Sequence, residues 1–143
     1  MNAFSHLKDI KVLLVDKSKF TQNTLKLAFA DLGLILHVTE SAQEALRLLE
    51  QNSVDVILCD DTLPDMTGLD FFKRVMRSCH NTVNVLISAA GDDEIISRAY
   101  GIGIQDFLQK PFLLKTILAT LTLHIRKQIR HTRRPLIEPL IAA

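Results

Sequence analysis

The sequence predicts an α/β protein: a doubly wound, five-stranded parallel sheet with helices on both of its faces. Two observations predict this fold class. Short runs of branched apolar residues alternate five times with segments that have helical spacing. The runs at 12–15 and 56–59 are continuously apolar, as expected for parallel strands that are covered on both faces. The 143 residues suit a single domain, and right-handed crossovers between the strands are expected.

The first predicted strand covers residues 11–15 and ends at Asp16. The segment 18–32 that follows has helical spacing, and Gly33 is a typical cap at its end. We expect the buried face of this helix to carry Phe20, Thr24, Leu27, Ala28 and Leu32.

The second strand is predicted at residues 34–38, and a helix of about ten residues follows it. Ser41 and Glu44 have the spacing of a capping box, in which the hydroxyl and the carboxylate each accept a main-chain N–H bond. This pair fixes the start of the helix, which is expected to end near residues 52–53.

The third strand, at residues 54–59, stops at two adjacent acids, Asp60 and Asp61. Pro64 and Gly68 mark the turn that comes next. The remaining elements are predicted as a helix at 68–77, a strand at 83–87 ending at Ser88, a helix at 92–100, a strand at 106–109 closed by Lys110-Pro111, and a helix at 112–131.

These boundaries predict a lead-in at 1–10, one domain at 11–131, and a C-terminal tail or linker stub at 132–143. Pro135 and Pro139 favour an irregular tail. Residues 1–110 carry 11 Lys and Arg against 15 Asp and Glu, whereas residues 111–143 carry 6 against 1. The basic run at 126–134 has three open interpretations: a solvated helix end, the start of a helix leading to an output domain, or a contact with an acidic partner or nucleic acid.

Several protein classes are disfavoured by composition. No apolar run reaches the roughly 18 residues that a membrane helix needs, and the N-terminus lacks the apolar core of a signal peptide. Cys59 and Cys79 have no metal-ligand spacing and are expected to be reduced thiols in a cytoplasmic protein. Direct nucleic-acid recognition is not expected, because no aromatic residue interrupts the basic run and no DNA-binding helix pair follows it.

Four strand ends carry polar side chains, and these ends meet at one edge of a parallel sheet, where such folds bind ligands. They are Asp16, Asp60, Ser88 and Lys110. Two neighbouring carboxylates repel each other and require a cation, which either the lysine or Mg²⁺ can supply. An aspartate held beside such cations can act as a nucleophile toward a phosphoryl group.

With these motifs the chain resembles the receiver domain of bacterial two-component response regulators over residues 11–122. The resemblance rests on Val-Leu-Leu-Val-Asp at 12–16, Cys-Asp-x-x-Leu-Pro-x-Met-x-Gly at 59–68, Ile-Ser-Ala at 87–89 and Lys-Pro-Phe at 110–112. It implies a flavodoxin-like receiver fold with strand order 2-1-3-4-5. It also implies a signalling domain that catalyses at most its own phosphorylation and dephosphorylation.

The resemblance further implies a role for each matching residue. By position, Asp60 is the phosphoacceptor; Asp16, Asp60 and the main-chain carbonyl of Thr62 are Mg²⁺ ligands; Ser88 is the switch hydroxyl; Phe107 is the switch aromatic; and Lys110 pairs with the phosphoryl group through a cis Lys110–Pro111 bond. The implied partners are a histidine kinase or phosphotransfer protein, a second copy bound through the face of the fourth helix, fifth strand and fifth helix, and a C-terminal output domain.

Besides a mild departure at residues 101–104, where the family commonly has Gly-Ala, two residues depart from the family pattern. Lys17 stands where the family has a second acid that binds the metal, and it either pairs with Asp16 or Asp60 or carries its ammonium to solvent. Asp61 is an extra acid, expected to point away from Asp60 into solvent. Lys17 favours an alternative function, a binding module of the same fold that ignores phosphorylation. A phosphatase of the haloacid dehalogenase kind is disfavoured because Thr62 replaces the second acid that it needs.

Overall fold

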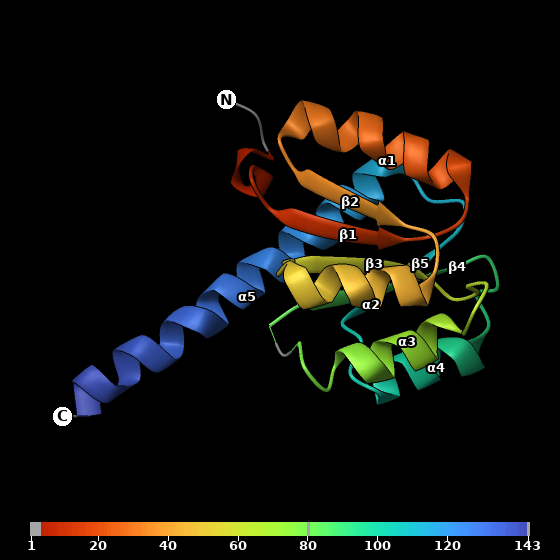
Figure 1. The fold of residues 1–143 in the computed structure, drawn as a ribbon. Helices are drawn as coiled ribbons and strands as arrows, with labels where there is room; N and C mark the ends of the chain where they lie inside the picture. Colours follow the sequence, from red (N-terminus) through yellow and green to blue (C-terminus); the bar gives the residue numbers. More distant parts are fainter. Residues whose placement is uncertain (1–3, 80, 143) are drawn as a thin grey trace.

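The computed structural model describes residues 4–79 and 81–142, with side chains described as far as Gln128. A five-stranded sheet in the order β2-β1-β3-β4-β5 forms its centre, and every strand pair is parallel (Figure 1). The elements in chain order are a short 3₁₀ helix η1 (Ser5–Leu7), β1 (Lys11–Val15), α1 (Lys19–Leu32), β2 (Ile35–Thr39), α2 (Ala42–Gln51), β3 (Val56–Asp60), α3 (Gly68–Val75), β4 (Val83–Ser88), α4 (Asp93–Gly101), β5 (Asp106–Gln109) and α5 (Leu114–Ala142). The predicted fold class and strand order are confirmed.

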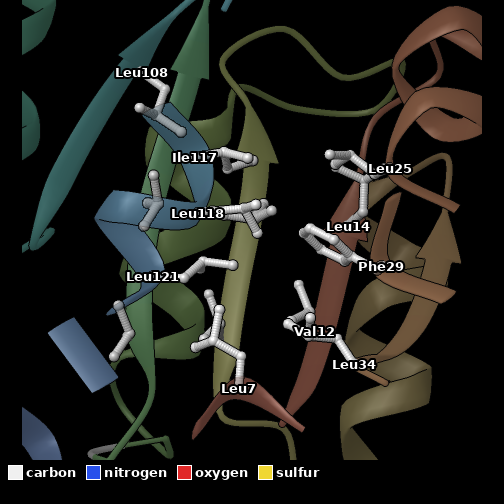
Figure 2. Close-up of a cluster of buried hydrophobic side chains, with 14 of the residues drawn as sticks. Leu7, Val12, Leu14, Leu25, Phe29, Leu34, Leu108, Ile117, Leu118 and Leu121 are labelled. Carbon is white, nitrogen blue, oxygen red and sulfur yellow. The ribbon is translucent and has the colours of Figure 1, made fainter. Parts of the chain in front are cut away.

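Each face of the sheet has its own apolar core, because successive strand residues point to opposite faces. On one face, Val12 and Leu14 of β1 pack with Phe29 of α1 and Leu121 of α5. Figure 2 shows the side chains of α1 and α5 converging over this face of the strands. Leu13 of β1 belongs to the second core, which α2, α3 and α4 cover. At about 1.5–3 kcal/mol for each large apolar side chain fully buried, these two layers provide most of the driving force for folding.

The buried face of α1 agrees with the predicted one only in part, since Ala28 and Leu32 are partly buried and pack against the core. Phe20 and Leu27 are 81% and 75% exposed, whereas Leu25 and Phe29 are fully buried. The helix is turned by about one residue because the polar Gln22 takes a buried position and donates to the carbonyl of Asp16 at 2.8 Å. That hydrogen bond offsets the cost of burying the amide, so counting only apolar residues gave the wrong rotation.

Two described segments near the termini, residues 5–7 and 132–142, are helical, which the sequence did not predict. Leu7 in the lead-in is fully buried, and His6 Nε2 lies 3.1 Å from the hydroxyl of Thr122 on α5. The prediction of an irregular tail is wrong, because α5 continues through Pro135 and Pro139 (Figure 1). A proline removes one main-chain donor but does not always stop a helix, and the Arg, Leu and Glu residues around these prolines favour one. Residues 1–3 of the lead-in and residue 143 of the tail lie outside the described residues.

In the part of the chain that the structure describes, no helix combines the length and the apolar character needed to cross a bilayer.

Candidate functional site

Two carboxylates lie side by side at the carboxyl edge of the sheet. Val15 is paired with Cys59, so the next residues lie on adjacent strand ends: Asp16 directly follows β1, and Asp60 is the last residue of β3. Asp16 is 1% exposed and Asp60 8%. Asp16 Oδ1 accepts the main-chain N–H of Ser18 at 2.9 Å, which fixes its orientation at the start of α1.

Lys110 joins the two acids. Its Nζ lies 2.7 Å from Asp16 Oδ2 and 3.1 Å from Asp60 Oδ1, directly after β5 and before the cis bond to Pro111. Burial raises the pKa of Asp60, and the Asp16 charge raises it further, while Lys110 opposes both effects. Burial tends to lower the pKa of Lys110, but the hydrogen bond and charge of Asp16, with the charge of Asp60, raise it overall. The structure therefore brings residues 16, 60 and 110 together in one charged cluster.

Ser88 lies beside this cluster but bonds to another acid. Its hydroxyl is fully buried and donates to Asp61 Oδ2 at 2.5 Å, while the main-chain N–H of Ala90 donates to the hydroxyl at 3.0 Å. The prediction of a solvated Asp61 is wrong, since this residue is only half exposed. Its own N–H donates to the carbonyl of Ile87 at 2.8 Å, which places Asp61 at the end of β4 next to Ser88.

The loop from β3 to α3 is held by close backbone contacts. A Cβ atom on Gly68 would lie 2.4 Å from the carbonyl oxygen of Asp60, so the loop can close only over a glycine. Asp65 accepts the N–H groups of Ala42 and Gln43 at 3.0 and 2.9 Å, at the start of α2. Partial burial acts to raise the pKa of Asp65, yet the bonds from these two N–H groups lower it overall. Sequence reasoning missed Asp65, because no local spacing links it to partners more than 20 residues away.

Phe107 and Thr62 are two further predicted site residues, on β5 and in the loop after β3. Phe107 is half-buried on β5 and packs against the core that α2, α3 and α4 cover. Its N–H donates to Asp106 Oδ1 at 2.8 Å, and Asp106 Oδ2 lies 2.8 Å from His124 Nε2 on α5. Thr62 is exposed in the loop after β3, and its hydroxyl donates to Asp61 Oδ1 at 3.2 Å.

Lys17 is exposed and forms no ion pair with Asp16 or Asp60 in the described part of the chain. Of the two arrangements left open by the sequence, the one with its ammonium in solvent is observed.

The oxygen atoms available at the cluster fit a Mg²⁺ ion that has few protein ligands. The described residues contain no group of three or more His, Cys, Asp and Glu that could hold a metal ion. The predicted ligands are Asp16, Asp60 and the carbonyl of Thr62. Such a small set suits Mg²⁺, which typically binds one or two carboxylates and completes its shell with water and phosphate oxygens.

A cavity of about 720 Å³ lies away from this cluster. It is at the opposite edge of the sheet, between Asn52, Asp55, Thr82 and Ile125. None of the predicted site residues lines it.

Comparisons with known proteins identify the family of this chain. The family model "Response regulator receiver domain" matches residues 12–122. The transcriptional regulatory protein TrcR of Mycobacterium tuberculosis is 33% identical over 133 residues, which are 92% of this chain and 51% of TrcR. The chemotaxis protein CheY of Thermotoga maritima is 29% identical over 71% of this chain and 86% of its own length.

Solved structures show the same fold. The chemotaxis response regulator CheY4 of Vibrio cholerae superposes with a TM-score of 0.76 at 28% identity, covering 82% of this chain and 99% of that one. The signal receiver domain of an HD domain-containing protein from Pseudomonas fluorescens has a TM-score of 0.82 at 26% identity, covering 89% and 94%. The chain spans about half or less of the length of the first transcriptional regulators that it matches. With the family model matching most of its residues, the chain belongs to the response regulator receiver domain family.

Proposed function

We propose that this receiver domain accepts a phosphoryl group on Asp60 from a histidine kinase or phosphotransfer protein. The observation that carries the proposal is the placement of Lys110 between Asp16 and Asp60 at 2.7 and 3.1 Å. A cation between two nearly buried carboxylates balances part of their charge, and it stands where the negative charge of a phosphoryl group would arrive.

The transfer needs little chemistry from the protein. An oxygen of the Asp60 carboxylate attacks phosphorus and forms the P–O bond. The P–N bond to the donor histidine breaks, and its electron pair remains on the imidazole. Lys110 stabilises the charge on the phosphoryl oxygens, and Asp16 keeps the ammonium in place. Mg²⁺, which Asp16, Asp60 and the Thr62 carbonyl would hold, supplies further neutralisation of the same charge when bound.

The readout involves the face formed by α4, β5 and α5. Ser88 would bond a phosphoryl oxygen, Phe107 would turn inward, and the face would then bind a partner or a second copy. Asp106 supports this route, because one carboxylate bonds both the N–H of Phe107 and the imidazole of His124 on α5. In the whole protein, which we expect in the cytoplasm, an output domain would follow α5, as the partial coverage of the regulators suggests.

Incubation with a small phosphodonor, acetyl phosphate, and Mg²⁺ tests the proposal. We expect intact mass to show one added phosphoryl group in the wild type and none in Asp60→Asn. An unmodified wild-type chain contradicts phosphorylation of Asp60 by this route. The matched control is Asp70→Asn on α3, which should be modified like the wild type, because Asp70 lies on the exposed surface.

A second candidate function is a binding module that ignores phosphorylation. Lys17 favours it, because an ammonium replaces the second acid that the family pattern has beside the metal site. Absence of both Mg²⁺ binding and phosphorylation in the wild type, with both restored in Lys17→Asp, would favour this alternative.

A further inference from the structure

The hydroxyl of Ser88 already has an acceptor in the unphosphorylated protein. A serine hydroxyl carries one proton, so it can donate fully to only one acceptor at a time. Here the proton points to Asp61 Oδ2 at 2.5 Å, and the carbonyl oxygen of Ala90, at 3.2 Å, is a longer alternative. The bond to the carboxylate is charge-assisted and is therefore the stronger of the two.

Asp61 is itself held in place from three sides. Its N–H donates to Ile87 at 2.8 Å, and its carbonyl accepts the N–H of Gly68 at 2.8 Å. The hydroxyl of Thr62 donates to Oδ1 at 3.2 Å, which leaves Oδ2 for Ser88. The acceptor is thus fixed by the ends of β3 and β4 and by the first residue of α3.

We propose that Asp61 is a positioning residue that keeps the Ser88 hydroxyl away from Asp60 and so sets how readily the switch responds to a phosphoryl group. This inference rests on the proposed function, because it concerns the competitor that a phosphoryl group on Asp60 meets. The phosphoryl oxygens and Asp61 compete for the same proton of Ser88. Removing the carboxylate therefore releases Ser88 and favours the activated arrangement.

The expected effect is measured with beryllofluoride, a phosphoryl analogue, in the presence of Mg²⁺. Amide NMR shifts of α4, β5 and α5 report binding in the wild type, Asp61→Ala, Asp61→Asn, Ser88→Ala and the double variant Asp61→Ala/Ser88→Ala. Asp61→Ala removes the hydrogen bond from Ser88 to a charged group, which stabilises only the resting state. This variant should therefore bind beryllofluoride about tenfold more tightly than the wild type. Asp61→Asn keeps an uncharged acceptor, so its affinity should lie between those of the wild type and Asp61→Ala.

The double variant separates the proposed role from a simple effect of charge. If Asp61 acts through Ser88, adding Asp61→Ala to Ser88→Ala should leave the affinity unchanged. Asp70→Ala is the matched control, since it removes a carboxylate from the exposed surface of α3 and leaves the bond between Asp61 and Ser88, so its affinity should stay within about threefold of the wild type.

Two results would overturn the inference while leaving phosphorylation of Asp60 intact. One is an Asp61→Ala variant that binds no more tightly than the wild type. The other is an equal gain in the presence and absence of the Ser88 hydroxyl, which would mean that Asp61 only adds negative charge near Asp60. A wild type that neither binds beryllofluoride nor becomes phosphorylated would overturn this inference together with the proposed function.

Discussion

Lys110 Nζ lies 2.7 Å from Asp16 Oδ2, although 94 residues separate the two along the chain. The same ammonium lies 3.1 Å from Asp60 Oδ1, so one side chain connects the ends of β5, β1 and β3. Asp16 is nearly inaccessible to solvent, and Lys110 is only 21% exposed. A buried acid that loses its partner destabilises the folded state, so this ion pair matters for stability as well as for the proposed phosphorylation.

Lys110→Met should lower the free energy of unfolding by about 3 kcal/mol at pH 7, because it leaves two adjacent buried acids without a cation. Urea unfolding measures this change. Lys115→Met, on the exposed side of α5, is the control and should change stability by less than about 0.5 kcal/mol. Equal stability of the two variants would contradict a structural role for the ion pair.

The pH dependence of the same pair follows from the raised pKa of Lys110. A raised folded-state pKa means that the stabilisation is fully present below the unfolded value near 10.5 and is lost as pH rises through the folded value. The wild type should therefore lose stability in this alkaline range, and Lys110→Met should lose less. Parallel alkaline profiles for the two proteins would show that other groups control this transition.

Asp60→Asn should stabilise the protein at pH 7 by about 1 kcal/mol, because it removes a charge that is buried beside Asp16. Burial and Asp16 raise the pKa of Asp60 above 3.8, so between 3.8 and the raised value the folded state binds more protons than the unfolded one. Stability then falls as pH rises through this window, and above it the penalty is complete. The gain should thus be present at neutral pH and vanish below 3.8, as urea unfolding at both pH values can show.

Lys17→Asp should strengthen Mg²⁺ binding at least about tenfold, because it replaces an ammonium with an oxygen ligand near two acids. Isothermal titration calorimetry with MgCl₂ measures the affinity directly. Lys115→Asp makes the same change of charge on α5, away from the cluster, and should leave the affinity unchanged. A similar gain in both variants would mean that overall charge, and not the site, determines binding.

Much of the fold could be predicted from the sequence because its signals are local. Most strands are short, largely apolar runs, and the ends of all five predicted strands agree with the structure within two residues. The meeting of Asp16, Asp60 and Lys110 followed from one rule, that the carboxyl ends of parallel strands share an edge.

The remaining features depend on contacts between distant parts of the chain. Asp61 bonds Ser88, 27 residues away, and the sequence alone showed only an acid after a strand. The rotation of α1 depends on Gln22, a polar residue that is buried because it bonds the main chain of Asp16 and the carboxylate of Glu40. The hydrophobic pattern of a helix does not show that a polar side chain such as Gln22 is buried when hydrogen bonds satisfy its amide.

A pair of substitutions on α1 tests the observed rotation of that helix. Phe29 is fully buried, so Phe29→Ala should cost about 3–5 kcal/mol of stability. Leu27 is 75% exposed, so Leu27→Ala should change stability by less than about 0.5 kcal/mol. Thermal or urea unfolding measures both, and a large cost for Leu27→Ala would restore the face predicted from the apolar pattern.

Gly68→Ala should destabilise the protein by about 3 kcal/mol, because the new Cβ would overlap the carbonyl oxygen of Asp60 at 2.4 Å. The same methyl would also lie 3.0 Å from Leu86 Cδ1 and from Asp61 Cα, so the loop has to shift as a whole. A shifted loop moves the Asp60 carboxylate relative to Lys110, and modification by acetyl phosphate should slow as well.

Gly101→Ala is the matched control: nothing lies within 4 Å of its new Cβ, and alanine favours the helix by about 0.5–1 kcal/mol. Urea unfolding should therefore move the two variants in opposite directions, and a Gly68→Ala variant as stable as the wild type would contradict the observed closure of the loop over Asp60.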